Sequence, residues 1–494
     1  MQPHGGPVVS ESPADLTVVE AAAAIRTRQL SPTELTEAVL ARIETLDPEI
    51  NAYITVLYDE AREMARAAQD EIAAGQDRGP FHGIPVGLKD LVDLQGVPTT
   101  GGTSFLRDNV AAEDGYLVGR LREAGAVFTG KLNMHEIAFG TDNVVSAYGP
   151  CRNPWATDRI PGGSSGGSGA AVAAGMCLAA TGSDSGGSVR MPASLCGVVG
   201  FKPTYGLIST RGMIPLSWTL DHAGVLCRTV EDAAAMTTAI AGYDERDPWS
   251  QPSPSVDYAA GLAGGVAGLR VGIPANHFFD HASTEVAAAV NEAARVLAGL
   301  GADVREVSVD LSAADPYKPL AASLGFEQGT AGMLRLLIGS EAVAYHRRYL
   351  PQHHDDYQPQ TTAKLDASAK FMAADYAAGQ QARAELTRAL ERLLTDEADL
   401  LLAPATPVTA MPIAEIESGG TARSLVTNLN TAVFNLTGQP SISIPCGFDG
   451  DGLPIGLMLS GPRWSEETVL RAAHAYEQAT EWHRRRPPPV ADKG

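Results

Sequence analysis

The sequence predicts an α/β protein, because strand and helix patterns alternate along the chain. Residues 269–310 carry the pattern of a strand, a helix and a second strand, which is typical of a parallel α/β unit. Residues 124–133, AGAVFTGKLN, form an apolar run of β-branched and aromatic side chains between glycines, which indicates a buried strand. Neither a solenoid repeat nor a separating linker is present, so we predict a single domain over residues 1–494.

The N-terminal segment, residues 15–75, is predicted to be helical. Its clearest helix start is SPTEL, where Ser31 is the N-cap, Pro32 takes the first helical position and Glu34 completes a capping box. We expect this helix to end near Asp47-Pro48, because a residue that precedes proline avoids the helical conformation.

The rest of the chain contains two regions of different character. Residues 80–240 hold the glycine- and serine-rich motifs, and we expect the catalytic residues to lie there. Residues 315–395 show a helical pattern and are predicted to be an insertion that shapes the substrate pocket. Further strands are predicted in three short apolar runs near the C-terminus: 399–407, 440–448 and 454–461.

The composition argues against several kinds of partner. The net charge of -21 would repel a phosphate backbone, so we expect no nucleic-acid partner. The five cysteines are odd in number and form no CxxC pair, so neither a disulfide framework nor a metal site is expected. The sequence shows no signal-peptide pattern and no apolar run that could span a bilayer, so we expect a cytoplasmic protein without membrane contact. A homodimer is left open.

The stretch GGSSGGSGAAVAAGMCLAATGSDSGGSVR, residues 162–190, allows several interpretations. GGSSGGSG has the composition of a flexible linker, but it leads directly into an apolar helix of small residues that must be buried. A phosphate-binding loop would need a Walker lysine or a preceding strand, and both are missing. The GxSxG match on Ser165 fits a nucleophile elbow formally; the required strand is missing, yet Asp221-His222 keeps this alternative open.

A fourth interpretation joins the two serine clusters to Lys89. This lysine lies in HGIPVGLKD, where the apolar residues before it favour burial, although a surface position is the ordinary alternative for any single lysine. A buried lysine whose pKa falls by roughly three units can accept a proton from a serine as histidine does. The absence of histidine from both serine clusters is then explained.

The chain resembles the amidase signature family in several long motifs that occur in the same order. The likeness covers nearly the whole chain and rests on these stretches: HGIPVGLKDLVD, TGKLNMHEIAFG, YGPCRNPW, PGGSSGGSGAAVAAG, GSDSGGSVRMPASLCGVVGFKPT, LLLAPATP and LTGQPSISIP. The resemblance implies the amidase-signature fold, an α/β fold with one large mixed β-sheet flanked by helices on both faces. It also implies an amidohydrolase that uses a small-molecule amide and water and needs no cofactor.

The family's catalytic group resembles a Ser, cis-Ser, Lys triad. Carried over by position, Lys89 is the general base and acid, Ser164 is the bridging serine, and Ser188, 24 positions later, is the nucleophile. The resemblance also places a cis peptide bond at Gly163-Ser164. The backbone amides of four consecutive residues are expected to hold the oxyanion: Ser185, Gly186, Gly187 and Ser188.

Five further positions are given supporting roles. Ser165 either hydrogen-bonds near the proton relay or caps the helix that follows. Asp184 and Arg190 flank the nucleophile, where we expect a structural ion pair that fixes the loop. Met134 and His135 match positions that line the family's acyl pocket, although a lone histidine is more often a packing residue.

The family divides into stand-alone amidases and the glutaminase subunit of a tRNA-dependent amidotransferase. At the position where the glutaminase subunit holds the ammonium group of glutamine with an acidic residue, this chain has the uncharged Asn428. The segment EAVAYHRRYLPQHHDDYQP also resembles stand-alone amidases. We therefore expect cleavage of aryl or alkyl amides through an acyl-enzyme on Ser188, with carbamates and esters as secondary substrates; the glutaminase subunit is the alternative.

Overall fold

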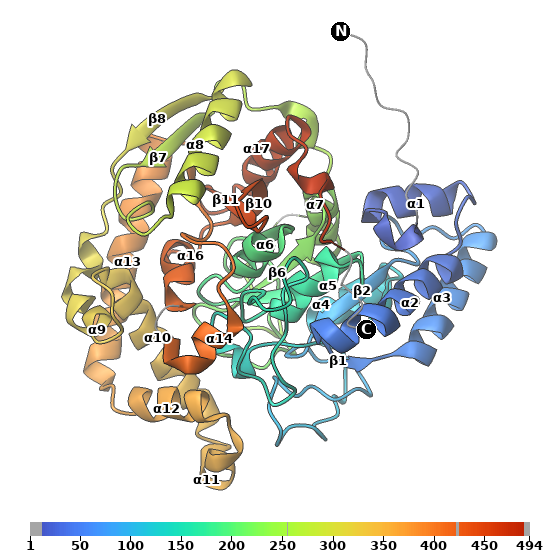
Figure 1. The fold of residues 1–494 in the computed structure, drawn as a ribbon, viewed down its shortest axis with the longest axis horizontal. Coiled ribbons are helices and arrows are strands. Elements are labelled where there is room, and N and C mark those ends of the chain that lie inside the picture. Colours follow the sequence, from blue (N-terminus) through green and yellow to red (C-terminus); the bar gives the residue numbers. More distant parts are fainter. Residues whose placement is uncertain (1–11, 254, 421–423, 489–494) are drawn as a thin grey trace.

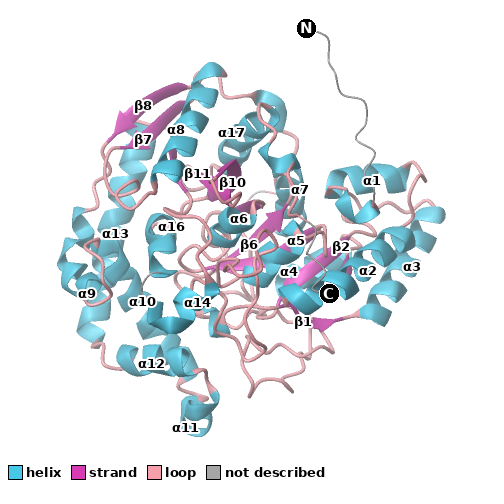
Figure 2. Ribbon diagram, in the orientation of Figure 1, coloured by secondary structure: helices cyan, strands magenta, loops and turns pink. Residues whose placement is uncertain are grey.

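One mixed β-sheet runs through the protein in the computed structural model, which describes residues 12–253, 255–420 and 424–488 (Figure 1, Figure 2). β2 pairs in parallel with β3 and β4, β7 pairs in parallel with β8 and β9, and the other neighbours are antiparallel. The predicted mixed sheet is therefore confirmed. Across the sheet, the eleven described strands follow the order β1 (Tyr53–Val56), β3 (Val127–Leu132), β2 (Pro85–Lys89), β4 (Ala179–Asp184), β6 (His222–Cys227), β5 (Val199–Lys202), β10 (Ser441–Phe448), β11 (Pro454–Ser460), β9 (Leu400–Pro404), β7 (Arg270–Pro274) and β8 (Asp303–Val307).

The strands predicted from apolar runs are all present. Residues 124–133 contain β3, and the three C-terminal runs contain β9, β10 and β11. These strands are almost wholly buried, which fits runs without alternating polar residues. The unit at 269–310 forms β7, helix α8 (Thr284–Gly299) and β8, and β7 is parallel to β8 as predicted.

Helices cover both faces of the sheet, as expected (Figure 1). Helices α5 (Gly166–Ala173) and α6 (Arg190–Cys196) pack against each other and onto central strands. In a second group, α17 (Glu466–Gln478) contacts both α7 (Val230–Ile240) and α8. The other described α-helices are α1 (Val18–Arg26), α2 (Pro32–Ile50), α3 (Tyr58–Ala73), α4 (Tyr116–Glu123), α9 (Lys318–Ala322), α10 (Gly329–His346), α11 (Leu350–His353), α12 (Pro359–Ser368), α13 (Ala373–Asp396), α14 (Ile413–Glu415) and α16 (Leu429–Leu436).

Helix α2 begins as predicted and ends later than predicted. Ser31 is its N-cap, and the reciprocal bonds between Ser31 and Glu34 form the expected capping box. The expected end near Asp47-Pro48 is wrong, because α2 continues through Pro48 to Ile50. A proline in the last turn removes only one helical hydrogen bond, and Oδ1 of Asp47 accepts the N–H of Ala52 at 2.7 Å just beyond the helix.

Helices α9 to α13 fill residues 315–395 and pack onto the region of residues 80–240. Glu341 on α10 accepts a hydrogen bond from Oγ of Ser217 at 2.9 Å, and Nζ of Lys364 on α12 donates to the Phe139 carbonyl at 2.6 Å. The role of this region in shaping the substrate pocket stays a prediction. Among the described helices, none combines the length and the apolar character needed to cross a membrane.

The capping box at the start of α2 yields a test of local stability. We expect Ser31→Ala to weaken the first turn of α2 by about 1 kcal/mol, because the N–H of Glu34 loses its side-chain acceptor. Amide hydrogen exchange should then be faster at Glu34 than in the wild-type chain. Ser31→Asn is the matched control, since asparagine also caps helices well; equal protection in the alanine variant would contradict the expectation.

Candidate active site

Three serine hydroxyls surround the amine of Lys89. Lys89 ends strand β2 and is completely buried, and its Nζ lies 2.8 Å from each Oγ of Ser164, Ser165 and Ser183. Ser164 and Ser165 lie in the turn before α5, whereas Ser183 lies on β4, next to β2. Among the described residues, no carboxylate contacts this amine. The structure thus joins Lys89 to the predicted bridging serine.

Burial makes Lys89 a base near neutral pH. It lowers the pKa of this lysine to about 7, and the negative charges of Asp184 and Asp221 oppose the shift only in part. A neutral amine has one lone pair and two N–H groups, so it can accept one proton and donate two hydrogen bonds. Three hydroxyl neighbours match that capacity.

Ser165 lies beside the amine and does not cap α5. Its hydroxyl donates to the Ser183 carbonyl at 3.2 Å, so its oxygen is left to accept an N–H from Lys89. The side chain makes no capping bond, although Ser165 occupies the N-cap position. Of the two alternatives, the structure therefore favours a place near the relay. The expected cis peptide bond at Gly163-Ser164 is present.

Ser188 lies in the turn between β4 and α6, close to the first serine turn. The N–H of Ser165 donates to the Ser188 carbonyl at 3.3 Å, which joins the two turns. Lys89 and Ser164 are fully buried, but Ser188 keeps 6% of its surface exposed. No partner for its hydroxyl occurs among the described residues, so this oxygen is free to meet a substrate. Its role as nucleophile stays a prediction.

The turn formed by residues 185–188, called the oxyanion turn below, has three amides without a partner among the described residues and one that is already hydrogen-bonded. The N–H groups of Ser185, Gly186 and Ser188 have no partner in the described part of the chain. The N–H of Gly187, however, donates to Oδ1 of Asp184 at 2.6 Å. The Gly187 amide is thus already bonded in this structure, and the role of the four amides in holding an oxyanion stays a prediction.

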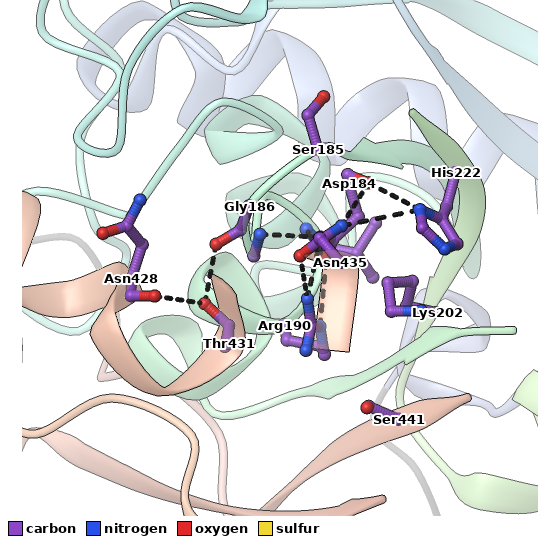
Figure 3. Close-up of polar contacts among 12 residues, drawn as sticks. Asp184, Ser185, Gly186, Arg190, Lys202, His222, Asn428, Thr431, Asn435 and Ser441 are labelled. Carbon is purple, nitrogen blue, oxygen red and sulfur yellow. Dashed lines mark hydrogen bonds and ion pairs between the residues drawn. The ribbon is translucent and has the colours of Figure 1, made fainter. Parts of the chain in front are cut away.

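Asp184 and Arg190 form a buried ion pair beneath this turn (Figure 3). Nη2 of Arg190 lies 2.9 Å from Oδ1 of Asp184, and Nε lies 3.0 Å from Oδ2. Burial alone would raise the pKa of Asp184, but the Arg190 guanidinium holds it well below its usual range. Oδ2 also accepts the N–H of Val189. The expected structural ion pair is thus present and it fixes the loop.

The two residues assigned to the acyl pocket lie inside the core. Met134 is completely buried in the main hydrophobic cluster. His135 is also buried, and its Nδ1 lies 3.1 Å from Oδ1 of Asp142. Burial lowers the pKa of His135 even though Asp142 opposes the shift. His135 thus lies beside the Asp142 carboxylate, although neither ring nitrogen makes a well-aligned hydrogen bond among the described residues. A pocket role for either side chain stays a prediction.

The side chain of Asn428 lies close to Gly186 of the oxyanion turn. A Cβ atom built on Gly186 would lie 3.1 Å from Leu334 and 3.5 Å from the Nδ2 atom of Asn428. These two side chains therefore flank the space above Gly186, with Leu334 coming from α10 and Asn428 from the residue before α16. The sequence motifs indicate Asn428 but carry no signal for Leu334.

Two residues of α16 hold the oxyanion turn and were not predicted. The hydroxyl of Thr431 donates to the Gly186 carbonyl at 2.8 Å, and Nδ2 of Asn435 donates to the Asp184 carbonyl at 2.8 Å (Figure 3). Asn435 lies just before LTGQPSISIP, one of the motifs that carry the resemblance, and that position was the available signal. No sequence pattern distinguishes Thr431.

A carboxylate also supports the first residue of the turn. The hydroxyl of Ser185 donates to Oδ1 of Asp221 at 2.5 Å, and Oδ2 of Asp221 accepts the N–H groups of Leu216 and Ser217. Burial raises the pKa of Asp221 to about 6. Asp221 was noted only as a member of an alternative triad, and the structure uses it as an anchor for Ser185.

Comparisons with known proteins find relatives that match nearly the whole chain. A profile of the Amidase family matches residues 34–470. The chain is 40% identical over 483 residues to a glutamyl-tRNA(Gln) amidotransferase subunit of Geobacter metallireducens, covering 95% of this chain and 98% of that one. Among solved structures, 6-aminohexanoate cyclic dimer hydrolase superposes with a TM-score of 0.84 at 32% identity, with 96% and 99% of the two chains covered.

A second solved structure is that of an aryl acylamidase. A bacterial aryl acylamidase of the amidase signature family superposes with a TM-score of 0.83 at 27% identity, with 95% of this chain and 98% of that one covered. The relatives thus include both amidotransferase subunits and stand-alone amidases. The profile match and the buried Lys89 with its serine neighbours lead to one conclusion: the chain belongs to the amidase family of hydrolases that act on carbon–nitrogen bonds.

Proposed function

We propose that this protein is a stand-alone serine amidohydrolase that forms an acyl-enzyme on Ser188. The observation that carries the proposal is the buried Lys89, whose pKa of about 7 leaves a large neutral fraction beside Ser164. A base with a pKa near the working pH is well suited to proton transfer. The exposed edge of Ser188, next to this pair, is the point at which a substrate carbonyl can reach the site.

Two proton transfers activate the nucleophile. Neutral Lys89 takes the proton of Ser164, Ser164 takes the proton of Ser188, and the Ser188 oxygen attacks the amide carbon. The free N–H groups of Ser185, Gly186 and Ser188 bind the oxyanion of the tetrahedral intermediate. The C–N bond then breaks as the proton returns through Ser164 to the leaving nitrogen. Water attacks the acyl-enzyme along the same route and releases the acid.

The residues above the oxyanion turn support an uncharged acyl group. Leu334 is apolar and Asn428 is a neutral amide, and both flank Gly186. Such a wall suits aryl or alkyl amides better than the charged α-amino group of glutamine. Two solved structures with this fold are described as an aryl acylamidase and a 6-aminohexanoate cyclic dimer hydrolase. Carbamates and esters are expected as secondary substrates, since the same acyl-enzyme chemistry applies to them.

The alternative is a glutaminase subunit that delivers ammonia to a partner. The identity of 40% to an amidotransferase subunit over almost the whole chain favours this alternative. The neutral Asn428 argues against it, because glutamine's ammonium group needs a negative partner. The two functions predict different behaviour of the isolated chain. A stand-alone amidase is active alone, whereas the glutaminase subunit is active only with its partner subunits.

Removal of the proposed nucleophile tests the reaction. We expect Ser188→Ala to lower anilide hydrolysis by at least about 10³-fold, because no acyl-enzyme can form. Release of a chromophoric aniline measures turnover, and intact-protein mass after a sulfonyl fluoride measures labelling. Ser194→Ala is the control, since Ser194 is buried on α6 and bonded to Thr406. Normal turnover in Ser188→Ala would contradict the assignment.

The protonation of Lys89 sets the pH profile. We expect kcat/KM to rise with pH through a limb near the Lys89 pKa of about 7, because only the neutral amine accepts a proton. Asp221→Asn should move this limb to lower pH, since the negative charge of Asp221 raises the lysine's pKa. Lys89→Arg should be inactive, because arginine keeps its proton. A flat profile across neutral pH would remove Lys89 from the base role.

A substrate panel separates the two candidate functions. The purified wild-type chain should hydrolyse short amides and anilides and leave glutamine intact. Asn428→Asp should raise the ratio of glutamine to anilide turnover by about tenfold, because a carboxylate near Gly186 can bind an ammonium group. Asn428→Ser, which stays neutral, is the control. Glutamine turnover that appears only after amidotransferase partner subunits are added would favour the alternative.

A further inference from the structure

The peptide between Gly186 and Gly187 lies at the centre of the oxyanion turn. Neither residue has a Cβ atom, so this part of the backbone is intrinsically the least ordered of the turn. The free N–H groups of Gly186 and Ser188 lie on either side of this peptide in the chain. An oxyanion site works only when its donors are already aligned. The order must therefore come from bonds to the Gly186–Gly187 peptide itself.

Thr431 holds the carbonyl end of this peptide. Its hydroxyl is completely buried and donates to the Gly186 oxygen at 2.8 Å. The Asn428 carbonyl, one helical turn earlier, is a competing acceptor at the longer distance of 3.2 Å. Figure 3 shows the Thr431 oxygen between these two carbonyls, with α16 directly beside the turn. The shorter contact assigns the proton to Gly186.

Asp184 holds the opposite end of the same peptide. Its Oδ1 accepts the Gly187 N–H at 2.6 Å, and it is itself held by Arg190 and by Nδ2 of Asn435 at 2.9 Å. Asn435 and Thr431 lie on α16 one turn apart. Helix α16 therefore constrains both polar ends of one peptide plane, directly at the carbonyl and through Asp184 at the N–H.

The contact between Thr431 and the turn is too close for any other residue at position 187. Gly187 has a φ of +128°, and a Cβ atom on it would lie 2.0 Å from the Thr431 oxygen. The glycine thus serves both the backbone conformation and the approach of the hydroxyl. Thr431 touches neither Ser188 nor Lys89 through any hydrogen bond in the described structure.

We propose that Thr431 is a positioning residue for the oxyanion-binding amides, a role that rests on the proposed acyl-enzyme function. The threonine clamps the Gly186 carbonyl away from the reacting oxygen and thereby sets the directions of the Gly186 and Ser188 N–H groups. Loss of the hydroxyl leaves a buried carbonyl without its partner, and the peptide between two glycines then reorients. The effect falls on the transition state, where the oxyanion exists, and leaves ground-state binding almost unchanged.

Two substitutions at position 431 separate the hydroxyl from the shape of the side chain. Thr431→Val keeps the shape and removes the donor, and Thr431→Ser keeps the donor. We expect the valine variant to lose about 10- to 100-fold in kcat on an anilide with KM within about threefold. The serine variant should retain kcat within about threefold of wild type. The pH limb set by Lys89 should stay in place in both variants.

Phenylboronic acid provides a readout of transition-state binding. Its tetrahedral adduct with Ser188 places an oxygen where the oxyanion forms, so its Ki in Thr431→Val should rise by the same factor by which kcat falls. Thr437→Val is the matched control, because Thr437 is a buried threonine at the end of α16 that bonds to the Val433 carbonyl. This control should keep both kcat and Ki while losing a comparable buried hydrogen bond.

The possible outcomes are distinct. Unchanged kcat and Ki in Thr431→Val, or an equal loss in Thr431→Ser, would overturn the positioning role while leaving the amidase function intact. If the wild-type chain cleaves no amide, the rate of labelling by a fluorophosphonate still compares the variants, since phosphonylation also develops charge at the oxyanion site. Slower labelling of the valine variant would support the role and equal labelling would refute it. A wild-type chain that is never labelled would remove both proposals.

Discussion

The burial of Lys89 without a carboxylate partner is the constraint on which the rest of the site depends. Desolvation of an ammonium group is costly, so burial lowers the pKa of Lys89 to about 7, and serine hydroxyls satisfy the amine. These hydroxyls come from β4 and from the turn before α5, and β4 lies beside β2 in parallel. The N–H of Lys89 also donates to Thr181 on β4. The pairing of two central strands therefore sets the geometry of the proton relay.

The buried charge pair of Asp184 with Arg190 follows the opposite rule. Its charges are retained because each neutralises the other at 2.9 Å. Asp184 also acts on Lys89, whose pKa its negative charge raises. Burial outweighs that charge and lowers the pKa of Lys89 to about 7, so the aspartate can shape the oxyanion turn without keeping the lysine fully protonated. The two buried groups are compatible because Asp184 and Arg190 neutralise each other, whereas Lys89 has a lowered pKa and its amine contacts only hydroxyls among the described residues.

Local patterns predict much of this architecture, and the remainder depends on distant partners. The capping box at Ser31 and the buried apolar strands are encoded within short segments. The family motifs predict that Lys89 and Ser164 act together, and in the structure the two side chains are hydrogen-bonded. The patterns do not specify β1, β2, β5 and β6, which are short strands ordered by pairing across the sheet. The Thr431 contact joins residues 245 positions apart, and the bonded Gly187 amide depends on a side-chain orientation. Neither leaves a local signature.

The position of α16 in the chain also determines when the site can form. Lys89 and both serine turns precede residue 200, whereas the helix that secures the Gly186 carbonyl begins at Leu429. Synthesis runs from the N-terminus, so both serine turns leave the ribosome before α16 does. During the synthesis of the residues between them, the oxyanion turn has its contacts with Asp184 and Asp221 but lacks the Thr431 hydroxyl on the Gly186 carbonyl. Full hydrolytic competence therefore depends on the last part of the chain, which supplies α16 and also adds β9, β10 and β11 to the sheet.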